Sequence, residues 1–92
     1  MKVINVSEEC HGLVCVAQSM KAAYQFLVKH RYLTFNTDIE IADNWMTIGE
    51  FFDERSWEKT DDNLIMWAWT RTEPEFWDGM FYFDEEDVYE ED

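Results

Sequence analysis

The residues best suited to chemistry are two cysteines and a histidine in the sequence ECHGLVC, residues 9–15. Cys10, His11 and Cys15 offer thiolates and an imidazole, which are zinc ligands and also the parts of a Cys-His nucleophile. The C-x4-C spacing lies outside the common zinc patterns, and no second ligand pair follows. Neighbouring strand side chains point to opposite faces, which separates the Cys10 thiol from the His11 ring. We therefore interpret the cysteines as a loop thiol and a core thiol, and expect no metal and no cofactor.

Other titratable groups give no stronger catalytic signal. Asp61 and Asp62 are adjacent, but 21 of the 92 residues are acids, so such pairs arise by chance. His30 falls on the apolar stripe of a helix predicted over residues 20–30, which favours a helix-terminal or core histidine. We expect that the protein is not an enzyme and has no small-molecule substrate.

The elements that must position these side chains fit one small domain over residues 1–92. A chain of this length buries only about 60 to 65% of its unfolded surface. It is nevertheless 47% hydrophobic and 17% aromatic, which argues for a folded core. Two cysteines do not make a disulfide framework, and the first residues lack the apolar stretch of a signal peptide. The cytoplasm of a host bacterial cell is the expected location, and no stretch is long enough to cross a membrane.

The first third of the chain predicts a β-hairpin followed by a helix. Residues 2–6 and 13–17 are rich in valine, and the loop between them closes at Gly12. Ser19 is a candidate N-cap for the helix over residues 20–30. Residues 34–45 alternate weakly and fit either a short strand or an extended crossing.

The rest of the chain predicts short helices and a last strand. Thr47 and Glu50 have capping-box spacing, which predicts a helix from residue 48 to about residue 55. Thr60 begins a second helix over residues 61–71, whose first-turn acids suit the helix dipole. A third short helix is predicted around Pro74, capped by Thr72 with Glu75 and ended by Gly79. Residues 80–89 then return as a strand.

This order predicts an α+β fold: one antiparallel sheet, made of the N-terminal hairpin and the C-terminal strand, with one main helix and two or three short helices. The last strand is expected beside the first. The predicted central core consists of Val3, Ile4, Val6, Val14, Val16, Phe26, Leu27, Phe81 and Phe83.

The net charge of −14 is distributed unevenly. Up to Leu33 the chain carries four basic residues and two acids, whereas from Asp38 onward it carries nineteen acids and three basic residues. The last fifteen residues contain eight acids and no base, so self-repulsion must cost the folded state some stability.

Acids alternate with aromatic residues in two stretches, FFDERSWEKTDD at residues 51–62 and FYFDEEDVYEED at residues 81–92. On a strand, Phe81 and Phe83 would face the core, while Tyr82, Asp84 and Glu86 would face outward. Side chains two apart on a strand lie roughly 6.6 Å apart, close to two base-pair steps of about 3.4 Å each. A row of carboxylates can therefore imitate phosphates.

In size, charge and these two stretches, the chain resembles small acidic inhibitor proteins encoded by phages, among them anti-CRISPR proteins that act on type II effector nucleases. The N-terminal third also resembles the start of small proteins from mobile elements. The resemblance implies a DNA mimic that occupies the PAM-binding cleft of an effector nuclease with its guide RNA and blocks target DNA. The partner is then a basic DNA-binding protein, with no direct binding of nucleic acid and no membrane. The candidate partner-binding residues are Asp53, Glu54, Trp57, Glu58, Asp61, Asp62, Tyr82, Asp84, Glu85, Glu86, Asp87, Tyr89 and Glu90.

Two alternatives stay open beside this hypothesis. Acidic ends are often solvated tails that keep a protein soluble. The chain is otherwise a non-mimic interaction or regulatory protein of a mobile element, whose binding would depend on tryptophan and survive high salt. Trp57, Trp67, Trp69 and Trp77 are mostly expected in the core, with one or two tryptophans exposed.

Overall fold

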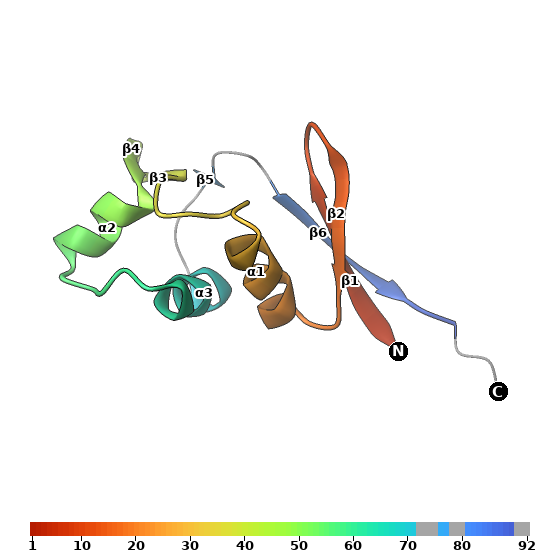
Figure 1. Cartoon of the computed structure of the whole chain (residues 1–92). Helices are drawn as coiled ribbons and strands as arrows, with labels where there is room; N and C mark the ends of the chain where they lie inside the picture. The colour runs from red at the N-terminus through yellow and green to blue at the C-terminus, as the bar shows by residue number, and fades with distance from the viewer. Residues whose placement is uncertain (72–75, 78–80, 90–92) are drawn as a thin grey trace.

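A computed structural model describes residues 1–71, 76–77 and 81–89 of the protein. The described chain forms two small three-stranded sheets at the two ends of an elongated molecule, with two helices packed between them (Figure 1). The predicted α+β fold is confirmed, including the antiparallel sheet of the N-terminal hairpin and the C-terminal strand. A second sheet, built from the middle of the chain, accompanies it.

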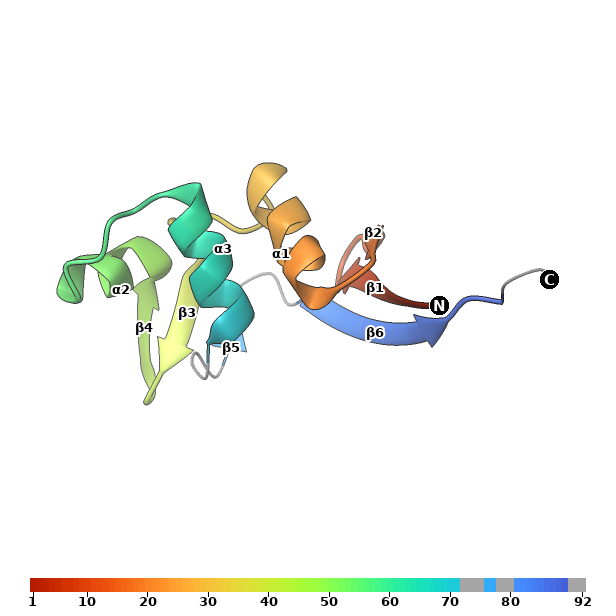
Figure 2. The same cartoon turned by 90° about the horizontal axis from the view of Figure 1, so that it is seen from below.

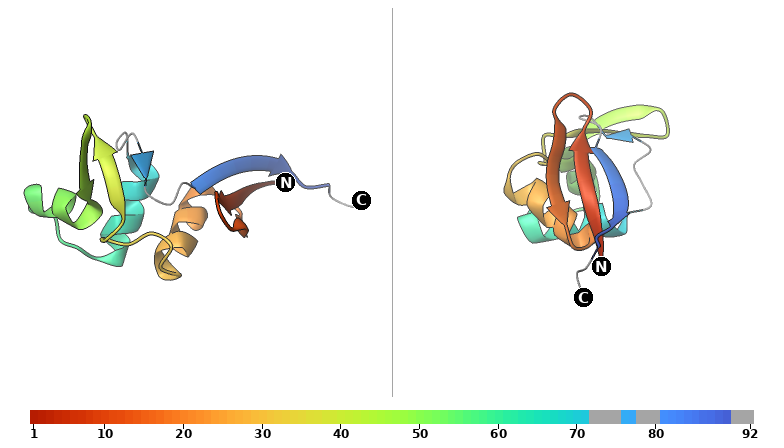
Figure 3. Two further views of the ribbon diagram at one scale, coloured as in Figure 1. Left: turned by 90° about the horizontal axis from the view of Figure 1, so that it is seen from above. Right: turned by 90° about the vertical axis from the view of Figure 1, so that its right-hand side faces the viewer.

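Sheet A has the strand order β2-β1-β6. Strands β1 (Lys2–Glu8) and β2 (Gly12–Ala17) form the predicted hairpin, and β6 (Phe81–Asp87) pairs antiparallel with β1 along its whole length. Figure 3 shows β1 between the other two strands. One face of sheet A is covered by helix α1 (Met20–Lys29), whose N-cap is the predicted Ser19.

A β-bulge in β2 decides which valines enter the core. Val6 lies opposite Cys15, and Ser7 lies opposite Leu13, so Val14 is the extra residue. The bulge shifts the register by one, and every side chain beyond it changes face. Val16 was expected in the core, but it is 55% exposed because Cys15 and Ala17 take the inward positions.

Sheet B has the order β4-β3-β5. Strands β3 (Asp38–Ile41) and β4 (Asn44–Thr47) form a hairpin in the segment whose state the sequence left open. Its two-residue turn, Ala42 and Asp43, has positive φ at both positions, as a type I′ turn requires. The third strand is β5 (Phe76–Trp77). Phe76 and Trp77 belong to the segment in which a short helix around Pro74 was expected. That helix prediction is wrong there, because Phe76 and Trp77 pair with β3; Thr72, Pro74, Glu75 and Gly79 lie outside the described residues.

Two further helices complete the fold. Helix α2 (Ile48–Glu54) begins at the predicted capping box of Thr47 and Glu50, and helix α3 (Asp61–Thr70) begins at the predicted N-cap Thr60. Helix α3 packs against α1 between the sheets (Figure 2). None of the described helices is long and apolar enough to cross a bilayer.

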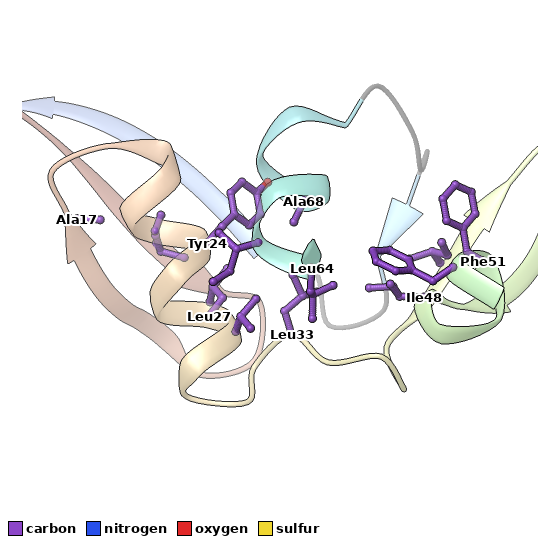
Figure 4. Close-up of a cluster of buried hydrophobic side chains, with 14 of the residues drawn as sticks. Ala17, Tyr24, Leu27, Leu33, Ile48, Phe51, Leu64 and Ala68 are labelled. Carbon is purple, nitrogen blue, oxygen red and sulfur yellow. The ribbon is translucent and has the colours of Figure 1, made fainter. Parts of the chain in front are cut away.

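The core is a continuous row of side chains that runs from sheet A through α1 and α3 to α2 (Figure 4). On α1 the buried residues are Ala23, Tyr24, Leu27 and Val28, so the buried stripe is rotated from the predicted one. Phe26 is only partly buried, and its ring stacks on His30 at 4.2 Å between centroids. Val3 is likewise only half-buried, because Ile4 and Val6 take the inward positions on β1.

Because Leu27 is fully buried and Phe26 is not, their truncations should differ. We expect Leu27→Ala to lower the free energy of unfolding by about 2 to 5 kcal/mol, and Phe26→Ala by about 1 to 2 kcal/mol. Urea denaturation of both variants measures the difference. A larger loss for Phe26→Ala would contradict the placement of α1 on the core.

Candidate functional site

The predicted partner-binding residues fall on two separate surfaces. Asp53, Glu54, Trp57, Glu58, Asp61 and Asp62 lie on α2, on the following loop and at the start of α3. Tyr82, Asp84, Glu85, Glu86, Asp87 and Tyr89 lie on β6 and directly after it, while Glu90 lies outside the described residues. Figure 1 shows α2 and β6 at opposite ends of the molecule, so the structure does not bring the two groups together.

The second group forms what we call the acidic edge, Asp84, Glu85, Glu86 and Asp87 on β6. Val88 N–H donates to the Met1 carbonyl at 2.7 Å, in register with the β1–β6 ladder. Hydrogen-bonded pairs alternate along an antiparallel ladder, so Glu85 and Asp87 direct their backbone groups away from β1. No described strand pairs with that side of β6, and the strand is therefore an open edge of sheet A.

The acidic edge carries carboxylates on both faces of the sheet. Asp84 is opposite Asn5 and Glu86 is opposite Val3, so these two acids share the outer face, as predicted. Glu85, opposite the inward-facing Ile4, lies on the face covered by α1, and all four acids are exposed. The strand therefore presents two short rows with a spacing of roughly 6.6 Å within each row.

Few of these charges are neutralised within the described chain. Lys2 Nζ contacts Glu85 Oε1 at 2.9 Å, and this hydrogen bond and the Glu85 charge raise the pKa of Lys2. Asn5 donates a hydrogen bond to Glu86. Among the described residues, no cation lies within ion-pair distance of Asp84 or Asp87. The acidic edge thus keeps most of its negative charge available.

The outer face of sheet A adds an apolar area beside these acids. Leu13, Val16 and Tyr82 are 63%, 55% and 44% exposed, and Leu13 and Tyr82 flank Ser7 on the two sides of β1. Tyr89, just beyond β6, is exposed as well. The exposure of Leu13 and Val16 was not predicted from the sequence, because strict alternation places Val16 inward and no sequence pattern indicates the bulge.

The first group centres on Trp57, which a helix-terminating turn holds in place. Ser56 N–H donates to Asp53 O and Trp57 N–H donates to Phe52 O, which together form a Schellman motif at the end of α2. Its left-handed residue is Ser56, with φ of 57°. The motif sets the Trp57 ring edge-on to Phe52, with 5.4 Å between centroids.

Beside Trp57 lies a pocket of about 430 Å³, which we call the aromatic pocket. Its lining residues are Phe52, Ser56, Trp57, Glu58, Asn63, Met66, Trp67 and Thr70. Asn63 Nδ2 donates to the Glu58 carbonyl at 2.9 Å, which ties the loop to α3. The sequence singled out Trp57 and Glu58, but not the α3 residues that complete the pocket.

The acids around this pocket differ in their ion pairing. Asp53 pairs with Lys59 at 3.0 Å and Asp61 pairs with Arg31 at 3.3 Å, both in exposed positions. Such pairs contribute little to stability. Within the described chain, no cation reaches ion-pair distance of Glu54, Glu58 or Asp62.

Three of the tryptophans are exposed in the described chain, more than the one or two expected. Trp45, Trp57 and Trp69 are 57%, 46% and 43% exposed, whereas Trp67 is half-buried. Lys21 Nζ lies 5.4 Å from the Trp69 ring centroid. Trp57 is the exposed tryptophan that also lines the aromatic pocket.

The cysteines and histidines are dispersed. Cys10 is exposed in the hairpin loop, Cys15 is partly buried on β2, and burial raises the pKa of the Cys15 thiol. His11 lies near Glu8, and His30 is the exposed C-cap of α1. No three potential metal ligands gather anywhere in the part of the chain that the structure describes.

Comparison with known proteins returns no family model, no curated protein and no solved structure that matches this chain.

The unpaired acids should make stability depend on salt. We expect the melting temperature to rise when sodium chloride increases from about 20 mM to about 300 mM, because screening weakens the self-repulsion. At low salt, Asp84→Asn with Asp87→Asn should also raise it, whereas Glu85→Gln loses the Lys2 pair and should gain less. Thermal denaturation by circular dichroism measures each change. A melting temperature that falls with salt would contradict this electrostatic account.

The left-handed conformation of Ser56 generates a further prediction. Glycine adopts positive φ without strain, so Ser56→Gly should stabilise the protein by about 1 kcal/mol. Ser56→Ala is the matched control, because it removes the hydroxyl and keeps the Cβ that causes the strain. Urea denaturation of both variants decides the point, and equal stability of the two would count against the strain.

Proposed function

We propose that this protein is an inhibitory binding protein whose acidic edge occupies the DNA-binding cleft of a basic nucleic-acid-binding protein. The observation that carries the proposal is the open edge strand β6, with exposed carboxylates on both of its faces. If β6 enters a cleft with its open edge leading, it presents one row of acids to each wall of the cleft. A duplex backbone offers a cleft the same combination of regular spacing and negative charge.

The partner best matched to this surface is a type II CRISPR effector nuclease with its guide RNA. Its PAM-reading site uses arginines aimed at base edges, and nearby cations contact the DNA backbone. Carboxylates form charge-assisted and often bidentate bonds with arginine. Tyr82 and Tyr89 lie exposed beside the acids and would add contacts that salt does not screen. In this proposal the protein blocks target DNA, acts in the host cytoplasm, catalyses nothing and binds no nucleic acid itself.

The test neutralises the acidic edge without changing its shape. Replacing Asp84 and Asp87 with Asn, and Glu85 and Glu86 with Gln, should leave the fold intact because all four side chains are exposed. Affinity for the effector should fall by several kcal/mol, since each lost charge-assisted bond is worth roughly 1.5 to 3 kcal/mol. Calorimetric titration into a panel of type II effectors loaded with guide RNA measures this loss.

A matched control tests whether binding depends on the position of the acids or only on the net charge of the protein. The same change in net charge is made away from the acidic edge with Glu9→Gln, Asp38→Asn, Glu40→Gln and Asp43→Asn. The control should bind and inhibit like the unchanged protein, and DNA bearing the PAM should compete with it for one site. If the acidic-edge variant inhibits as well as the unchanged protein, the acids only maintain solubility.

A second candidate function follows from the apolar outer face of sheet A. Leu13 and Val16 are exposed on β2, and Tyr82 is exposed across β1 from them on the same face. A non-mimic interaction protein of a mobile element would bind through this face. Its complex would survive high salt and would be weakened by Leu13→Ser, whereas the mimic complex would weaken steeply as salt rises.

A further inference from the structure

The aromatic pocket is a preformed cavity that the proposed function does not use. Its lining residues belong to α2, α3 and the loop between them. Figure 1 shows α2 and β6, which carries the acidic edge, at opposite ends of the molecule. The pocket volume of about 430 Å³ falls within the range of ligand sites, and Trp57 and Met66 at its surface are 46% and 48% exposed. Two indoles, a phenyl ring and a thioether are among the groups that line it.

The walls are fixed before any ligand arrives. The Schellman motif after α2 holds Trp57 against Phe52, and the Phe52 ring also packs against Trp67 at 5.7 Å. The Asn63 side chain binds the Glu58 carbonyl, and the Asn63 N–H donates to the N-cap hydroxyl of Thr60. A site ordered in this way loses little conformational entropy on binding.

The electrostatics of the pocket favour a cation. Glu58 is the charged residue in its lining, and no lysine or arginine contributes to that lining in the described chain. Aromatic faces attract cations through their quadrupole. Outside this lining, a guanidinium already stacks on a neighbouring ring, since Arg55 Cζ lies 3.5 Å from the centroid of the Phe51 ring and 5.7 Å from that of Trp57.

We propose that the aromatic pocket binds the side chain of an arginine on a partner protein. The planar guanidinium stacks on aromatic rings and is more weakly hydrated than an ammonium group, so it loses less on entering an apolar cavity. Glu58 supplies a carboxylate that such a group pairs with in two parallel hydrogen bonds. The remaining volume accommodates the aliphatic stem and the adjoining backbone. This proposal does not depend on the acidic edge, and each can fail without the other.

The test uses the full chain and two tripeptides that differ only in charge. N-acetyl-Gly-Arg-Gly-amide is titrated into ¹⁵N-labelled protein at about 150 mM salt, a concentration that screens exposed charges. The comparison peptide carries citrulline, the neutral isostere of arginine. The arginine peptide should shift the Trp57 and Trp67 indole N–H signals saturably and leave that of Trp45 unchanged, with a Kd at least about fivefold lower than that of the citrulline peptide.

Variants identify the pocket as the site. Trp57→Ala should raise the Kd of the arginine peptide about tenfold, whereas Trp45→Ala, which removes an exposed indole elsewhere, should not change it. If Trp57→Ala disturbs the fold, Glu58→Gln tests the pocket instead, because it removes only an exposed charge. It should raise the Kd of the arginine peptide about threefold. Equal affinity for citrulline, shifts spread over the acids without saturation at Trp57, or the absence of binding would each overturn the proposal.

Discussion

The fold depends on the seam between α1 and α3, and Tyr24 lies at its centre. The Tyr24 ring packs against Phe83 of β6 at 5.2 Å, and its hydroxyl accepts a 2.7 Å hydrogen bond from Arg71, the C-cap of α3. A small sheet needs a hydrophobic face or a helix packed against it to be stable. The seam makes the side chains of both sheets one continuous core, so the last strand, the main helix and the second sheet are held together through a few contacts.

This arrangement explains why the two proposed binding surfaces are separate. Sheet A packs against α1 at one end, sheet B contacts α2 at the other, and the molecule is about 52 Å long. The acidic edge and the aromatic pocket therefore occupy different elements, although both come from stretches in which acids alternate with aromatic residues. On β6 this alternation places Phe83 inward and Asp84 outward. After α2, a turn with a left-handed Ser56 brings Trp57 to the pocket instead.

Local interactions make much of the fold predictable from the sequence. Ser19, Thr47 and Thr60 each cap a helix at the predicted position, since capping needs only a side-chain oxygen and a few neighbouring amides. The bulge at Val14 and the type I′ turn at Ala42 could not be predicted from the sequence. Tertiary packing sets the register at Val14 and imposes a positive φ on Ala42, which does not favour it. The pocket escaped prediction for a related reason: Met66 and Trp67 join Trp57 only after α3 docks.

The acids of β6 also oppose the unwanted strand pairing that an open edge strand allows. An unpaired strand edge such as that of β6 can recruit other strands. Two copies that paired through β6 would bring carboxylates of the same sign into opposition, which is destabilising. A strand or cleft rich in arginine and lysine meets no such penalty. The charge that disfavours pairing between two copies would also favour the basic partner that we propose, so the two rows of acids on β6 would serve both roles.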